Sequence, residues 1–589
     1  MSKNQKTEWD LSLLYKGAHD PQIEIDIQNV EKANIAFEKK FKNVDFTSTP
    51  QKLAKALEYS TKIREQFSTV SGTWYFGLRK DLDGKDTVSS ALATKYNQRL
   101  THSYNRLTFF HLAIGKIPKN KQAVYLKHKL LAPYAYSLKK IFLEGQYRLS
   151  EAEEQLEDLL SQPAYTMWVD GQEKLLNEQT VVSEGKTVSL PEASAKLHQL
   201  PKKKRHDLYK KIIQAQKNIS HFAEAEINAI VNFKKVLDER RGFLKPYSSR
   251  VLANENDEES IEVLMDLITK HFHLSHRFYA LHTRLLKEKK ITVADRSTKI
   301  GEIQRQFDFH SSVAIVKKAI GKVNPQFSSL LESFLEKGQI DVYPKKGKAG
   351  GAYCSGHALL PTFILLNHVS SIGSVETFAH EMGHAIHTEL SKKQPPQYRR
   401  YSTATAEVAS TFFEQVTIDE LEKDLSDKEK IIFYHNRLLG DISTIFRQTA
   451  FFNFELELHN RIRKEGELSK QDIAKLMAKH LKSYLGKSVE VLDDDGYFFV
   501  NLSHIRMFFY VYTYAYGQLV SRALFEKWKA DPSYAKSIEQ FLTAGKSMSP
   551  KDIFKKIGIN TADPAFFKAG LMSIEKDIAK LESLTRKKT

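Results

Sequence analysis

Apolar residues recur every three or four positions along much of the chain, the spacing typical of amphipathic helices. This pattern predicts helices over residues 22–43, 86–114 and 192–216, and it continues over 202–237 and 257–290. A polar stretch that contains glycine, "VDGQEKLLNEQTVVSEGKTVSLPEAS", interrupts the helices and predicts a small hairpin. We therefore expect a mainly α-helical protein.

Residues 339–369 depart from the helical pattern. Segments "IDVYP" and "TFILLN" resemble strands, and the glycines of "GKAGGAY" between them let a ligand approach the backbone closely. Two strands that lead into a helix suit a site that holds an extended peptide, and we expect this peptide to contact Gly350, Gly351, Ala352 and Tyr353. A simple hairpin between helices explains this segment equally well.

The chain has 589 residues, which is long for a single core, and we place a domain boundary near residue 200. We expect an N-terminal helical domain over 1–200 and a second domain over 201–589. No apolar stretch approaches the ~18 residues that a membrane span needs, and the N-terminus lacks the apolar segment of a secretory signal. Cys354 is the only cysteine, which excludes an internal disulfide and favours a reducing, cytoplasmic setting.

The net charge is +18, from 89 basic and 71 acidic residues. Such an excess also occurs in nucleic-acid-binding proteins, but here basic and acidic residues are mixed along the predicted helices and no nucleic-acid motif accompanies them. We therefore expect no nucleic-acid partner. A milder consequence of the positive charge is that a basic interior groove would favour peptides with acidic groups. The sequence does not give the oligomeric state.

The stretch "SVETFAHEMGHAIHTEL", residues 374–390, carries a His-Glu-x-x-His pattern. On a helix, His384 lies only about 40° around the axis from His380, so both imidazoles can face one metal ion. Glu381 lies beside them, placed to accept a proton from water rather than to bind the metal. Zinc prefers such nitrogen ligands and leaves one position open in catalytic sites.

Two more polar residues, Glu376 and His387, fall within about 40° of His380 on the same helical stripe. The opposite face is apolar, and Gly383 permits close approach of another backbone or of the ligand. A buried structural histidine is the usual explanation for any one of these residues. It does not readily explain three histidines on one stripe with an acid between them.

A third protein ligand is needed. Glu389 lies about 180° from His380 and is excluded, and Leu390 stands where the pattern "HExxHxxGxxH" has its third histidine. The segment "TATAEVASTFFEQV" offers Glu407 and Glu414 on one helical face. Seven residues separate them by about 10 Å, so they cannot both bind one ion. Geometry alone does not choose between them.

The motif "VETFAHEMGHAIH" followed by "AEVASTFFE" resembles the oligoendopeptidase F family, relatives of thimet oligopeptidase. Similar motifs extend over almost the whole chain, in "TEWDLSLLY", "KKGKAGGAYCSG", "FILLNH" and "SHIRMFFYVYTYAYG". The resemblance implies two helical lobes around a deep channel, a small β-sheet beside the zinc helix, and one zinc ion on His380, His384 and Glu407. It leaves Glu376 and Glu414 as outer acids that orient the histidines, and we expect the same supporting role for His387.

Two residues depart from that family. Cys354 stands where relatives have a serine, and Tyr516 where they often have a small residue. Neither change removes a group that the chemistry needs, but both would reshape specificity.

Amide hydrolysis also needs donors for the negative oxygen of the tetrahedral intermediate. Between His504 and Gly517 the chain has Tyr510, Tyr512, Tyr514 and Tyr516. An aromatic stripe is more often core than catalytic, although four phenols are more hydroxyls than a dry core easily satisfies. The resemblance implies that a histidine and at least one tyrosine here bind the substrate carbonyl. If the helix is already regular at His504, Tyr512 is the best placed donor, with Tyr510, Tyr514 and Tyr516 as substitutes.

These features predict a zinc endopeptidase that cuts short unfolded peptides, with Glu381 as the general base. One alternative is a carboxypeptidase or dipeptidase, which would need a cationic residue such as Arg506 for the terminal carboxylate of the substrate. Another is a basic nucleic-acid-binding or scaffold protein with an inactive metal helix. The sequence does not give the cleavage preference.

Overall fold

Helices account for most of residues 5–586, the part of the chain described by the computed structural model, so the mainly α-helical class is confirmed. The hairpin is confirmed as β1 (Thr180–Ser183) and β2 (Lys186–Ser189). The helix expected over 22–43 is confirmed as α1 (Pro21–Phe41), whereas each of the other expected ranges is divided between two shorter helices. Before α11 (Lys202–Asn218) the break follows from Pro201, whose extended backbone precedes the helix.

The elements form two compact units, and each unit combines three separate segments of the chain. Unit 1 contains the chain up to Gln146, Gln304–Lys423 and Lys527–Gly558; unit 2 contains Tyr147–Ile303, Asp424–Glu526 and the chain from Ile559. This division differs from the single boundary expected near residue 200, because residues on both sides of that position belong to unit 2.

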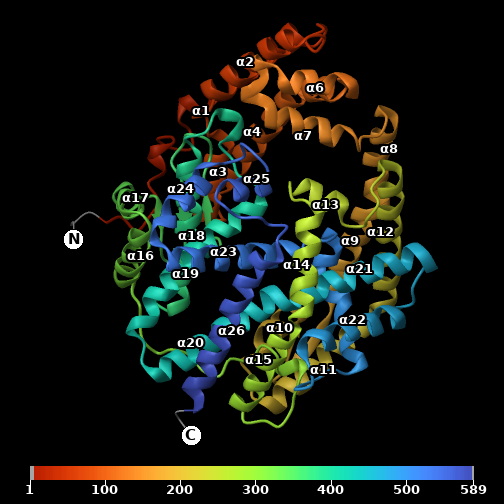
Figure 1. The fold of residues 1–589 in the computed structure, drawn as a ribbon, viewed down its shortest axis with the longest axis vertical. Coiled ribbons are helices and arrows are strands. Elements are labelled where there is room, and N and C mark those ends of the chain that lie inside the picture. Colours follow the sequence, from red (N-terminus) through yellow and green to blue (C-terminus); the bar gives the residue numbers. More distant parts are fainter. Residues whose placement is uncertain (1–4, 587–589) are drawn as a thin grey trace. The chain divides into compact units, whose positions relative to one another are not determined.

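The helices of unit 1 are α1 (Pro21–Phe41), α2 (Pro50–Gln66), α3 (Gly72–Leu82), α4 (Thr87–Asn105), α5 (Thr108–Gly115), α6 (Lys119–Lys127), α7 (Ala135–Gly145), α16 (Phe309–Val323), α17 (Pro325–Lys337), α18 (Ile372–Ser391), α19 (Thr403–Leu421), α24 (Ala535–Thr543) and α25 (Pro550–Lys556). Helices α18 and α19 pack along each other (Figure 1). This pair carries the predicted metal site.

A three-stranded sheet lies beside α18 in unit 1, as the resemblance implied. Its order is β4 (Ile340–Asp341), β6 (Phe363–Leu365) and β5 (Tyr353–Ser355), so β5 is an edge strand. Strands β4 and β6 correspond to the predicted strands. Trp9 packs on this sheet, and its indole nitrogen donates to the Ile364 carbonyl at 2.8 Å.

The helices of unit 2 are α8 (Glu151–Ser161), α9 (Met167–Glu178), α10 (Leu190–Leu197), α11, α12 (Ser220–Arg241), α13 (Ser248–Ala253), α14 (Glu258–Lys270), α15 (Phe272–Leu285), α20 (Asp427–Asp441), α21 (Gln448–Glu465), α22 (Lys470–Leu485), most of α23 (Tyr512–Ala530), and α26 (Pro564–Arg586). Short strands β3 (Ile291–Thr292) and β7 (Val489–Glu490) pair in parallel. Over residues 5–586, no helix combines the length and apolar character needed to cross a membrane.

Candidate active site

Helix α18 presents its histidines because its other face is buried. The Ser371 hydroxyl caps the helix by accepting a hydrogen bond from the Ser374 N–H at 3.2 Å. Val375, Phe378 and Met382 are fully buried, as the apolar pattern predicted. Burial of this face fixes the rotation of the helix and so sets the direction of the histidine stripe.

Gly383 lets α18 and α19 approach closely. A Cβ atom at this position would lie 2.7 Å from the Ser410 Cα and 3.1 Å from the Ala409 carbonyl oxygen, both on α19. Any larger residue would push the two helices apart. The glycine therefore brings together the two helices that carry the predicted ligands.

Three predicted ligands converge from these helices. The ligand atoms of His380, His384 and Glu407 all lie within 4.8 Å of one another. The Glu407 carboxylate is 3.4 Å from His380 Nε2 and 3.8 Å from His384 Nε2. A tetrahedral zinc ion with bonds near 2.0 Å needs ligand atoms about 3.3 Å apart. The spacing and the two-imidazole, one-carboxylate composition both suit zinc.

Glu414 occupies a different position from Glu407. Its Oε2 lies 3.2 Å from Nδ1 of His380, the ring nitrogen that points away from Glu407. A carboxylate there orients the ring and increases its basicity. Glu376 lies one turn before His380 on α18 and is half-buried. The geometry thus separates the two acids that sequence periodicity could not tell apart.

The acids and histidines of this cluster perturb one another strongly. Burial acts to lower the pKa of His380. Hydrogen bonds to Glu407 and Glu414 outweigh this effect and raise the pKa of His380 to about 10. Burial and the His380 charge lower the pKa of His384 to about 4. Although burial acts in the other direction, the two histidines lower the pKa of Glu407 to about 2. Glu407 is thus held ionised, as a metal ligand must be.

Glu381 is buried beside the cluster, and its Oε2 has no hydrogen-bond partner among the described residues. Burial raises its pKa to about 7, opposed by the His380 charge. A carboxylate with a pKa near neutrality can both accept and return a proton. An unpaired buried oxygen is costly, so its presence here points to a chemical use.

His387 is fully buried below the cluster and stacks on Tyr401, with ring centroids 3.8 Å apart. The Tyr401 hydroxyl lies 2.9 Å from the Thr388 hydroxyl. No periodic signal in the sequence marks Tyr401, because it lies in the loop before α19. Glu389 points away from the cluster, toward Thr362 at 2.6 Å, in agreement with its exclusion as a ligand.

The predicted peptide-binding segment leads into the free edge of the sheet. Gly351 has a φ of +75°, which favours glycine, and Asn367 donates to the Gly351 carbonyl at 2.7 Å. Ala352 and Tyr353 follow, and the Tyr353 hydroxyl donates to Asp81 at 2.6 Å. A Cβ atom on Gly350 would meet nothing within 4 Å inside unit 1. The segment is anchored at both ends. Within residues 5–586, β5 pairs with β6 alone, so its other edge has no strand partner.

The predicted oxyanion residues lie in unit 2, where His504, Tyr510 and Tyr514 form one cluster. Nε2 of His504 is 3.2 Å from the Tyr514 hydroxyl, and the Tyr510 and Tyr514 rings meet edge to face at 5.4 Å. All three side chains are half-buried. This cluster therefore presents two hydroxyls and an imidazole that are partly exposed.

Tyr512 and Tyr516 require a correction. The Tyr512 side chain is fully buried, and its hydroxyl accepts hydrogen bonds from Asn254 at 2.8 Å and Asn256 at 3.2 Å. Tyr516 is 2% exposed. The condition that favoured Tyr512 does not hold, because α23 begins only at Tyr512 and the residues before it are not a regular helix.

A buried network holds the segment between His504 and Tyr510. Phe508 and Phe509 have φ values of +44° and +54°, which are strained for phenylalanine. The Phe509 N–H donates to Glu455 at 2.8 Å, and Arg250 Nε donates to the Phe508 carbonyl at 3.0 Å. Arg506 forms a bidentate pair with buried Glu226 at 2.6 and 2.7 Å. Arg506 is thus a structural residue of unit 2.

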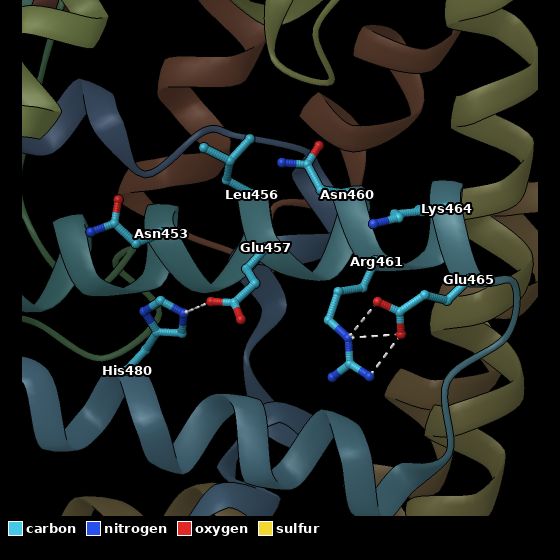
Figure 2. A pocket seen from close by; sticks show the side chains of 8 residues that line it. All are labelled: Asn453, Leu456, Glu457, Asn460, Arg461, Lys464, Glu465 and His480. Carbon is cyan, nitrogen blue, oxygen red and sulfur yellow. Dashed lines mark hydrogen bonds and ion pairs between the residues drawn. The ribbon is translucent and has the colours of Figure 1, made fainter.

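A surface pocket of about 530 Å³ lies between α21 and α22 in unit 2 (Figure 2). Its two acids are already engaged: Glu457 accepts from His480 at 2.9 Å, and Glu465 pairs with Arg461 at 2.9 Å. None of the residues predicted for the active site lines it. It takes no part in the site described above.

Comparison with known proteins agrees with this geometry. The model of peptidase family M3 matches residues 197–573, and a second model, described as oligopeptidase F, matches residues 114–176. The chain is 26% identical to oligopeptidase PepF of Bacillus subtilis over 91% of this chain and 81% of that protein. It is also 26% identical to an oligoendopeptidase F homolog of Borreliella burgdorferi, over 97% and 98% of the two chains.

Solved structures share the fold. One from Chlamydophila abortus aligns with a TM-score of 0.86 at 21% identity, over 98% of both chains. Oligoendopeptidase-F from Enterococcus faecium aligns with a TM-score of 0.69 at 19% identity, over 96% of this chain and 98% of that one. Because the M3 model covers more than half of the chain, this protein belongs to peptidase family M3, with the oligoendopeptidase F enzymes, and is a metallopeptidase.

Proposed function

We propose that this metallopeptidase is a zinc-dependent endopeptidase that cuts internal bonds of short, unfolded peptides. The observation that supports this most is the convergence of His380, His384 and Glu407 within 4.8 Å, with the unpaired Oε2 of Glu381 beside them. Cys354, the only cysteine and a free thiol, suits the reducing cytoplasm that we propose as its location.

His380, His384 and Glu407 would hold the zinc ion, with Glu414 orienting His380. When bound, zinc supplies a Lewis acid that polarises the scissile carbonyl and lowers the pKa of water. Glu381 accepts the proton of the attacking water and delivers it to the leaving amine. Its raised pKa, about 7, matches this double role at neutral pH.

The remaining groups bind substrate. The free edge of β5, after Gly350 and Gly351, would pair with an extended peptide, which selects unfolded chains because a folded protein offers no free strand. From unit 2 we assign His504 and the hydroxyls of Tyr514 and Tyr510 as donors to the substrate carbonyl. Tyr512 and Tyr516 are left as core residues.

Arg506, the cation suggested for binding a terminal carboxylate, is not available, and this weakens the exopeptidase alternative. Arg506 is 5% exposed, and Glu226 already neutralises it. An enzyme that recognises only chain ends would need a free terminal charge on its substrate. A peptide blocked at both ends therefore separates the two functions.

The test uses an internally quenched peptide blocked at both termini, together with metal analysis. Wild type is expected to contain one zinc per chain, to cleave the blocked peptide and to lose activity with a chelator. Glu381→Gln should retain the zinc and lose at least about 10³-fold in kcat, as expected when the general base is removed. Full activity in this variant, or no cleavage by the zinc-loaded wild type, would contradict the proposal.

A further inference from the structure

Two arginines in unit 1 have no acidic partner. Arg64 lies in the last turn of α2, and Arg400 lies in the loop before α19. Both are solvent-exposed, and neither forms an ion pair with any residue in 5–586. Their immediate neighbours in sequence do pair: Arg399 bonds Glu65 at 2.8 Å. Arg64 and Arg400 therefore lack ion pairs although an ion pair forms directly beside them.

The Arg399–Glu65 ion pair brings the end of α2 to the loop before α19, so Arg64 and Arg400 lie near each other. Although the Arg64 side chain still contacts solvent, the surrounding protein partly desolvates it, and this desolvation and the charge of Arg400 both lower the pKa of Arg64. Tyr104 faces the same two guanidinium groups, which oppose the rise that burial causes in its pKa. Two like charges held together repel, and binding an anion relieves that repulsion.

Arg64 and Arg400 adjoin the proposed peptide site on two sides. The residue after Arg400 is Tyr401, which stacks on His387 of the metal helix. On the other side, the Leu359 N–H donates to the Ser68 carbonyl at 3.2 Å and joins the loop after β5 to the end of α2.

His357 belongs to that same loop and is also close to Arg400, whose charge adds to desolvation in lowering the His357 pKa. Its ring stacks on Trp74, and the Trp74 indole donates to Ser355 of β5 at 2.8 Å. The arginines thus lie near the edge strand on which we propose that the peptide lies.

We propose that Arg64 and Arg400 form a subsite for a carboxylate of the peptide substrate, either its C-terminal group or an Asp or Glu side chain. The inference rests on the proposed peptidase function. Arginine suits this role because its planar guanidinium binds carboxylates through two parallel hydrogen bonds and stays charged. The subsite lies in unit 1 and does not involve Arg506, which belongs to unit 2 and is already paired with Glu226. It recognises an acidic group without making the enzyme an exopeptidase.

The experiment compares quenched peptides of three kinds, all built on one sequence that contains several Gln residues. The first is neutral and ends in a C-terminal amide, and the second has a free C-terminal carboxylate. The third is a series of amides in which Glu replaces one Gln at a time. The readout is the ratio of kcat/KM for an acidic peptide to that for the neutral peptide. Because both values come from one enzyme sample, partial misfolding cancels. Wild type should favour an acidic peptide by about tenfold, the effect of one charge-assisted contact.

The variants assign that preference to the arginines. Arg64→Gln together with Arg400→Gln should bring the ratio to about 1, and Arg400→Glu should bring it below 1. Lys62→Gln removes one exposed positive charge from the same helix and should retain the wild-type ratio. Whether the free terminus or the Glu series carries the preference identifies the source of the carboxylate.

A wild-type ratio near 1, or a preference that survives the double substitution, would overturn the subsite. Failure of wild type to cut any of these peptides is a different result, and it would contradict the peptidase function itself.

Discussion

Gly383 of α18 faces Ser410 of α19 so closely that a Cβ atom on the glycine would lie 2.7 Å from the Ser410 Cα. Two ligands lie on one of these helices and the third on the other, so the contact sets the separation of the donors. We predict that Gly383→Ala weakens zinc binding by at least about tenfold, because overpacking costs about 1–3 kcal/mol or moves the helices.

Gly373 provides a matched control within α18, since a Cβ atom there would approach only the Ser371 hydroxyl, at 3.8 Å. Gly373→Ala should bind zinc as wild type does. Competition with a chromogenic chelator measures both affinities. Equal affinities for the two variants would show that the helix contact does not set the ligand geometry.

Glu407 and Glu414 are predicted to affect the metal to different degrees. Glu407→Ala removes a ligand and should abolish stoichiometric zinc. Glu414→Ala removes only the carboxylate at Nδ1 of His380, 3.2 Å away, and should weaken zinc about 10–100-fold while leaving a loaded enzyme at high zinc. Titration of zinc into the two apoproteins tests this order. The reverse order would exchange the roles assigned to the two acids.

The arrangement of residues around helix α18 could be predicted because one amphipathic helix has a single regular period. Its buried face and its polar stripe both follow from that period. The choice between Glu407 and Glu414 could not be predicted, because it depends on how α19 lies against α18. The same holds for Arg64 and Arg400, which lie far apart in the sequence and meet only through tertiary contacts.

Tyr512 shows where periodicity misleads. The angular argument assumed a regular helix from His504, but the chain passes through Phe508 and Phe509 in the left-handed region. Phenylalanine seldom adopts that conformation, so no residue signalled the break. The buried partners that stabilise it, Glu455 and Arg250, lie in distant segments.

The tyrosines give a paired prediction. Tyr514→Phe removes a hydroxyl that lies beside His504, and it should lower kcat by about 10²-fold with little change in thermal stability. Tyr512→Phe leaves the Asn254 and Asn256 amides without their buried acceptor, and it should lower stability by about 1–3 kcal/mol with a small effect on kcat. Steady-state kinetics and thermal melts on both variants distinguish the roles. A loss of kcat in Tyr512→Phe alone would restore Tyr512 as the donor.

Glu455 gives a prediction about pH and stability. It is fully buried on α21, and burial raises its pKa from 4.5 to about 8, partly opposed by the Phe509 N–H and the charges of Arg250 and Lys234. The nearby His459 stays neutral, since burial lowers its pKa far below the usual value. The unfolded chain loses the Glu455 proton near pH 4.5, whereas the folded chain keeps it to about pH 8. Stability therefore falls as pH rises through this range, by at most about 5 kcal/mol.

Glu455→Gln cannot ionise, yet its side-chain oxygen can still accept the Phe509 N–H. The variant should therefore lose less stability than wild type between pH 5 and pH 9, as measured by denaturant unfolding at each pH. Glu457→Gln is the control on the same helix. Although burial acts in the other direction, Lys479 and His480 lower the pKa of Glu457, so Glu457 is ionised in the folded and the unfolded chain over this range. Its replacement should leave the dependence of stability on pH unchanged. If the stability of Glu455→Gln depended on pH as that of wild type does, the buried carboxyl would already be ionised in the native protein, stabilised by Arg250 and Lys234.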